Sequence, residues 1–172
     1  MKITVYHGAT EIIEVPLNHV GRPRLDFGQG FYVTDLKDQA IKWAKTIAEK
    51  RAAQPLLNIY TLDRDAILAE ARCKIFTAYD KDWLDFIVGN RRGENPARDY
   101  DYVEGGIAND RVIDTVNLYM TGFYDAESAL QQLIFHIFAK EKKKKKKKYE
   151  TRKQQNTITP RRNQARIRCF MR

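Results

Sequence analysis

An uninterrupted run of seven lysines, residues 142–148, limits how much of this chain can fold. Like charges in such a run repel one another and remain solvated, and almost no apolar periodicity follows them. From Lys140 to Arg172 the chain carries 15 Lys or Arg and two Glu, a net charge of +13. Because the whole chain carries +9, residues 1–139 carry −4. We therefore expect a folded domain at 1–139 and a basic tail at 140–172 that is disordered or out of frame.

The composition is that of an ordinary soluble protein, with 43% apolar and 31% charged residues. No apolar run approaches the ~20 residues that span a bilayer, and the first residues lack the apolar stretch of a signal peptide. Two cysteines, Cys73 and Cys169, are too few for a disulfide framework or a four-cysteine metal site. We expect a cytoplasmic protein with no membrane association and no metal.

Hydrophobic periodicity predicts an α+β fold. Alternating apolar residues predict strands at about 2–6, 30–34, 56–62 and 100–103, with a further short terminal strand within 163–170. Apolar residues at helical spacing predict helices at about 36–51, 81–90, 110–121 and 125–138. Thr34 or Asp35 is the expected N-cap of the first helix, and Gly122 is expected to end the third.

Two glycines one residue apart, Gly28 and Gly30, lead directly into the second strand. They lack the third glycine of a dinucleotide fingerprint and precede the strand instead of following it, so a doubly wound nucleotide-binding fold is not supported. Taken alone they are a turn, His7-Gly8 is a turn with a polar cap, and Trp43 on the apolar side of its helix is a core residue. Their order and spacing in combination, however, favour a binding site.

Together these residues resemble the ADP-ribosyltransferase superfamily, in its His-Tyr-Glu branch of the diphtheria-toxin and poly(ADP-ribose) polymerase type. The Phe-Gly-x-Gly-aliphatic-Tyr-Phe motif of that branch is similar to residues 27–33 here. The closest resemblance is to a bacterial family grouped with these transferases and known as a domain of unknown function. Its motifs His-Gly-Ser/Thr, Asp-Phe-Gly-x-Gly-Phe-Tyr-x-Thr, Ala-x-x-Trp-Ala and Asp-x-Val-x-Gly-x-Ile-Ala-Asn-Asp correspond to 7–9, 26–34, 40–44 and 101–110. The resemblance covers roughly residues 3–135.

The resemblance implies a split mixed β-sheet with helices around it, and mono-ADP-ribosyl transfer from NAD with release of nicotinamide. The acceptor would be a protein or a nucleic acid. The resemblance assigns the two faces of the flat nicotinamide ring to Tyr32 and Trp43, and each aromatic contact adds ~0.5–1.5 kcal/mol beyond the buried area. The main chain of Gly8 would bind the carboxamide, and His7 would bond a ribose hydroxyl.

The turn at Phe27, Gly28 and Gly30 would bring the backbone close to the dinucleotide and aim Tyr32. Two positions depart from the superfamily pattern. Ala40 stands where the polymerases often have a Ser that bonds the carboxamide, and the lysine run begins where the family places a late strand headed by Gln or Glu.

Gln164 is the best remaining candidate for that catalytic position, whereas Glu127 lies inside a helix pattern and is expected on the surface. Asn109 and Asp110 are expected to cap the helix that follows, with a substrate-side contact as the alternative.

The tail has three interpretations. It is a basic arm that attracts nucleic acid through counterion release, a solvated linker that delivers a late strand to the sheet, or a reading-frame slip at a homopolymeric codon run. We favour the third, under which the sheet lacks its catalytic strand. Two further functions accordingly stay open: a catalytically silent NAD- or ligand-binding module of the same fold, and nucleic-acid binding through the tail.

Overall fold

The computed structural model describes residues 1–106, 110–136 and 166–170, and the chain divides into two compact units. Unit 1 comprises Met1–Ala78, Asp85–Ile107 and Ala165–Arg172. Unit 2 comprises Tyr79–Leu84 and Ala108–Gln164. The sheet and the residues from 7 to 43 that the sequence assigns to a site all belong to unit 1.

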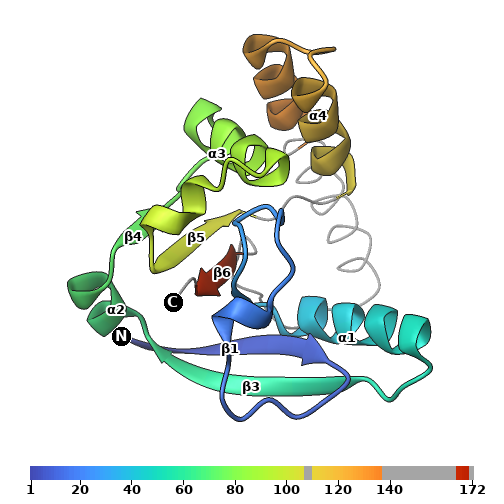
Figure 1. Cartoon of the computed structure of the whole chain (residues 1–172), viewed down its shortest axis with the longest axis vertical. Helices are drawn as coiled ribbons and strands as arrows, with labels where there is room; N and C mark the ends of the chain where they lie inside the picture. The colour runs from blue at the N-terminus through green and yellow to red at the C-terminus, as the bar shows by residue number, and fades with distance from the viewer. Residues whose placement is uncertain (107–109, 137–165, 171–172) are drawn as a thin grey trace, which may run out of the picture. The chain divides into compact units, whose positions relative to one another are not determined.

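A six-stranded mixed sheet forms the body of unit 1 (Figure 1). In spatial order its strands are β3 (Leu56–Asp63), β1 (Lys2–Ala9), β2 (Phe31–Thr34), β6 (Arg166–Phe170), β5 (Tyr102–Gly106) and β4 (Cys73–Ile75). The β4–β5 ladder is parallel and the other ladders are antiparallel. The predicted mixed sheet of an α+β protein is therefore confirmed.

Several strand bounds differ from the predicted ones. β1 runs on to Ala9, three residues beyond its predicted end, because it pairs with β3 along its whole length. β5 begins two residues later than predicted, at Tyr102, and the N–H groups of Asp101 and Tyr102 both bond the main-chain oxygen of Arg72. β4 was not predicted, since three residues are too few to show a period.

β6 lies between β2 and β5 and pairs with both. Residues 166–170, assigned from the sequence to the basic tail, therefore belong to the sheet, and the boundary at residue 139 does not separate them from the folded domain. The predicted short terminal strand within 163–170 is confirmed, and β6 supplies the ladders that complete β2 and β5. Such a strand is what the linker interpretation of the tail predicts. The lysine run lies outside the described residues.

The helices are α1 (Lys37–Arg51), α2 (Arg64–Glu70), α3 (Lys81–Arg92) and α4 (Asp110–Met120), and residues 126–136 are also helical. Short 3-10 turns occur at Asn18–Val20 and Pro96–Asp99. The sequence did not predict α2, which is only seven residues long. In the described ranges no helix has the length and apolar character needed to cross a bilayer.

α1 packs against β1 through three small residues, Ala40, Ala44 and Ala48, which are all buried. Its N-cap is Leu36, and no side chain caps it. The prediction of Thr34 or Asp35 as the cap is wrong. The Thr34 hydroxyl instead accepts from the Leu36 N–H and donates to the Gln39 side chain, so it fixes the turn before the helix.

Unit 1 has apolar clusters on both faces of its sheet. Val5, Phe31 and Val33 form one cluster, covered by partly buried residues that include Ile13 and Tyr60. On the other face Phe27 packs with Phe76 and Phe86, with ring centroids 6.2 and 6.4 Å from its own. The first cluster comes from alternate residues of β1 and β2, whereas the second comes from the turn before β2, the residue after β4 and α3.

In unit 2, α4 and the helix at 126–136 each bury one apolar stripe, formed by Val112 and Val116 on the first and by Ala129 and Leu133 on the second. α4 ends as predicted at Gly122, whose φ is +76°. The N–H groups of Gly122 and Phe123 bond the carbonyls of Tyr119 and Leu118, which is the Schellman arrangement.

Candidate functional site

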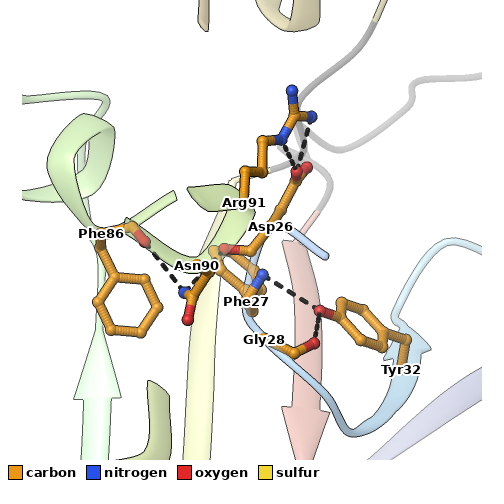
Figure 2. Close-up of polar contacts among 7 residues, drawn as sticks. All are labelled: Asp26, Phe27, Gly28, Tyr32, Phe86, Asn90 and Arg91. Atoms are coloured by element: carbon orange, nitrogen blue, oxygen red, sulfur yellow. Dashed lines mark hydrogen bonds and ion pairs between the residues drawn. The ribbon is translucent and has the colours of Figure 1, made fainter. Parts of the chain in front are cut away.

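The turn at residues 26–30 is held from inside by the side chain of Tyr32 (Figure 2). The Tyr32 hydroxyl donates to the main-chain oxygen of Gly28 at 2.6 Å and accepts from the N–H of Phe27 at 3.1 Å. Gly28 has φ +80°, and a Cβ there would lie 2.7 Å from the Cβ of Ala97. Glycine is therefore required by both conformation and space, and the turn and the tyrosine fix each other.

α3 holds the same turn from outside, which the sequence did not reveal. The buried carboxamide of Asn90 donates to the main-chain oxygens of Asp26 and Phe86 at 3.1 and 3.0 Å. Its oxygen accepts from the N–H of Ala97 at 3.3 Å. Beside it, Arg91 forms an ion pair with Asp26 through two nitrogens, each 2.7 Å from Oδ1 (Figure 2). The turn is thus bonded on two sides.

His7 and Tyr32 present their side chains to opposite faces of the sheet. Tyr6 pairs with Thr34, so these two share a face, and alternation places Gly8 and Tyr32 on that face with them. The His7 ring lies on the other face, stacked on Phe31 with centroids 4.4 Å apart and planes 29° apart. His7 and Tyr32, which the sequence assigned to one site, are therefore joined through the main chain of Tyr32: its oxygen accepts from His7 Nδ1 at 2.7 Å.

That bond fixes the tautomer of His7. A main-chain oxygen only accepts, so Nδ1 carries the proton and the neutral ring keeps a lone pair at Nε2. Nε2 has no hydrogen-bond partner among the described residues. Burial lowers the pKa of His7 below its usual value, and the bond to Tyr32 offsets this only in part. His7 therefore offers a hydrogen-bond acceptor to a ligand that carries a hydroxyl.

Gly8 is required by the packing of α1. A Cβ at Gly8 would lie 2.1 Å from the main-chain oxygen of Ala40 and 2.8 Å from the nitrogen of Ala44. The sequence pointed to close approach of a ligand, whereas the structure has close approach of a helix backbone. Ala40, at the position where the polymerases often have serine, is itself buried in α1.

Trp43 lies on the flank of α1 that faces β2 and is 51% exposed. It follows Gln39 by one helical turn, and the Gln39 side chain is bonded to Thr34 of β2. The interpretation of Trp43 as a core residue is therefore wrong, and its indole is open to a ligand on the face that carries Tyr32 and Gly8. A surface depression of about 300 Å³ lies at the C-terminal end of α1 and contains none of the predicted site residues.

The remaining predicted site residues are placed as follows. Phe27 is a core residue, only 2% exposed, so its ring packs in the protein. Gly30 is buried, and a Cβ added at Gly21 would lie 2.5 Å from the main-chain oxygen of Gly30. Asp110 begins α4 in unit 2. Asn109 and Gln164 lie outside the described residues.

Glu104 is a fully buried carboxylate that the sequence did not single out. Its Oε2 accepts from Arg64 Nε and from the Tyr102 hydroxyl, both at 2.9 Å. The ion pair raises the pKa of Arg64. Because the carboxylate is inaccessible and already neutralised by an arginine, this cluster is structural: it ties the start of α2 to β5.

The chain matches the family model described as "Protein of unknown function (DUF3990)" over residues 3–156. It belongs to this family, as its motifs predicted. The match begins in β1 and extends past the lysine run. No curated protein and no solved structure matches the chain.

Proposed function

We propose that this chain binds NAD at the junction of β1 and β2 and transfers its ADP-ribose unit to an acceptor. The observation that carries the proposal is the hydrogen bond between His7 Nδ1 and the Tyr32 oxygen. It holds the imidazole still and leaves Nε2 as an acceptor, and a ribose hydroxyl is the donor that suits it. The β1–β2 ladder contains one described register pair, Tyr6–Thr34, so the strands are not joined by further pairs at His7 and Gly8.

Nicotinamide, bonded directly to that ribose, would lie beside it where the β1–β2 ladder is open beyond Tyr6–Thr34, against the ring of Tyr32 and the exposed indole of Trp43. A flat aromatic ring gains from such contacts, and the half-exposed indole needs no rearrangement to provide one. In the reaction the bond between the ribose C1′ and the nicotinamide nitrogen breaks, and nicotinamide leaves with the electron pair. An acceptor oxygen or nitrogen bonds C1′ and loses its proton. The residue that stabilises the transition state is the predicted Gln164.

The test uses Trp43 as a reporter. Trp83 is the second of two tryptophans and is fully buried, so fluorescence quenching by an added ring reports on Trp43. NAD and free nicotinamide should both quench it, and ADP-ribose should not, although it should compete with NAD. Trp43→Phe should abolish the quenching. Absence of NAD binding by both fluorescence and calorimetry would refute the proposal.

Two substitutions separate the roles of the His7 nitrogens. Asparagine keeps a donor near the Nδ1 position and lacks the Nε2 acceptor, whereas glutamine places a polar group near Nε2. His7→Asn should weaken binding of NAD and ADP-ribose and leave binding of free nicotinamide unchanged. His7→Gln should bind NAD more tightly than His7→Asn. If His7→Asn weakened the binding of free nicotinamide as much as that of NAD, His7 would act on the fold and not on the ribose.

A catalytically silent NAD-binding module is the second candidate. It is favoured by Glu104, because this fully buried carboxylate is already engaged with Arg64 and Tyr102. Incubation with labelled NAD and cell lysate distinguishes the two. Label on an acceptor that is lost in Tyr32→Ala supports transfer, whereas NAD binding without any label supports the silent module.

A further inference from the structure

Asn90 and Arg91 have no part in the motifs by which the chain resembles a transferase, yet they bond the turn that carries Gly28. Asn90 is 1% exposed, and its carboxamide joins three segments: the turn, α3 itself and the 3-10 turn at Pro96–Asp99. Arg91 and Asp26 are both largely buried, with side chains 17% and 29% exposed. A pair of this kind holds its geometry better than an exposed one.

The position of Tyr32 depends on these contacts. Its hydroxyl bonds main-chain atoms of Phe27 and Gly28, which directly follow Asp26. A shift of Asp26 therefore moves the Phe27 N–H that bonds the hydroxyl, because this N–H belongs to the same peptide unit as the Asp26 oxygen. Phe27 is anchored in the core by its ring, so the turn can move mainly where Asn90 and Arg91 hold it.

We propose that Asn90 and Arg91 are positioning residues for the ligand site, which hold Asp26 and thereby set the angle at which Tyr32 presents its ring. This inference rests on the proposed function for its ligand, and on the contacts of the turn for its geometry. Neither residue touches the ligand. A displacement of the ring by a fraction of an ångström weakens stacking while the fold survives.

The experiment compares Arg91→Ala with Arg72→Ala. Arg72 forms a similar two-nitrogen contact with Asp101 in the same unit, at the start of β5 and away from residues 26–30 in the sequence. Arg91→Ala should raise the Kd for nicotinamide on the order of tenfold, below the ~100-fold that a 1 Å misplacement can cost. Arg72→Ala should leave the Kd within about twofold of wild type. Equal effects of the two substitutions would overturn the proposal.

A double-mutant cycle tests whether Arg91 acts through the Tyr32 hydroxyl. In a Tyr32→Phe background the turn has lost its bond to the ring, so Arg91→Ala should change the Kd by less than about twofold. Effects that add fully would show that Arg91 acts by another route. Arg91→Lys keeps the charge but loses the second contact, and it should restore part of the affinity.

A readout without NAD separates this inference from the proposed function. With ¹³C-labelled tyrosine, the ring signal assigned by its loss in Tyr32→Phe should shift in Arg91→Ala and stay in place in Arg72→Ala. An unmoved signal in folded Arg91→Ala refutes the positioning role, whatever NAD does. Asn90→Asp should shift the same signal, because an ionised carboxylate cannot donate to the Asp26 oxygen. If Asn90→Asp does not fold, Arg91→Ala decides the question.

Discussion

His7 and Tyr32 are joined by a hydrogen bond of 2.7 Å although their rings lie on opposite faces of one sheet. The bond uses the main chain of Tyr32, whose hydroxyl is occupied by its own turn. A single residue of β2 thus fixes an imidazole on one face and closes a glycine turn on the other. Ligand binding and pH should consequently be linked at this point.

Lowering the pH should destabilise the protein through His7. Burial places its folded-state pKa below the unfolded value of about 6.5, so the unfolded chain binds the proton more readily. The free energy of unfolding should therefore fall as pH drops through about 6.5 towards the folded-state pKa. Urea denaturation over this range measures the effect. His7→Gln should flatten the dependence.

The affinity for NAD should weaken over the same pH range. Protonation turns Nε2 from an acceptor into a donor, so a ribose hydroxyl can no longer donate to it and must give up its other acceptor or reorient. Calorimetric titration at several pH values measures this. A pH-independent Kd in a protein that remains folded would contradict the assigned tautomer.

Gly8→Ala should destabilise unit 1 by at least about 2 kcal/mol. The new methyl group would meet backbone atoms of α1 at 2.1 and 2.8 Å, and a helix backbone cannot move aside as a side chain does. Gly89→Ala is the matched control. The atoms nearest to its Cβ would be side-chain atoms of Glu94 and Pro96, at 3.2–3.3 Å, and alanine favours a helix, so we expect a change within about 1 kcal/mol. Thermal and urea unfolding report both.

Trp43→Ala and Trp83→Ala should separate ligand binding from stability. Trp83 is 0% exposed and its ring packs against Tyr79 with centroids 4.7 Å apart, so its removal should cost about 3–5 kcal/mol. Trp43 is half-exposed, so its removal should leave the midpoint of unfolding nearly unchanged and weaken nicotinamide binding. A large loss of stability in Trp43→Ala would argue that the indole is structural after all.

Glu104→Gln should destabilise the protein by about 3 kcal/mol, because Arg64 keeps its charge and loses its ionic partner in a largely buried place. The measurement is urea unfolding at neutral pH. Asp101→Asn removes one carboxylate from the more exposed pair with Arg72 and should change much less. Equal effects would show that burial of Glu104 contributes nothing.

Periodicity was sufficient for the elements that bury one regular face. β3 and α1 lie close to their predicted positions, and Gly122 ends α4 as its sequence indicated. α2 and β4 escaped prediction because their seven and three residues are too short to show a period. The family could be predicted from the order and spacing of the motifs along the chain, because these can be recognised even where the role of a single residue is ambiguous.

The contacts that define the candidate site were not predictable in the same way. Gly8 was correctly marked as a point of close approach, but the sequence does not say whether a ligand or α1 approaches. Asn90 and Arg91 are 64 and 65 positions from Asp26, and no local pattern connects residues so far apart. Trp43 falls at helical spacing beside Ala40 and Ala44, and this spacing predicted a core residue. The buried side of α1 consists of small alanines, and the larger indole next to them remains half-exposed.

β6 has a consequence for how this protein is made. It pairs with β2 although Thr34 and Arg166, where the two strands come closest in the sequence, are 132 positions apart. Contacts between such distant segments form late in folding, because the chain must first be confined. Until then β2 and β5 each present an unfilled edge, which is the surface on which chains of the same kind pair with one another and aggregate. Newly synthesised molecules therefore pass through an interval in which these two edges are open to pairing with other chains.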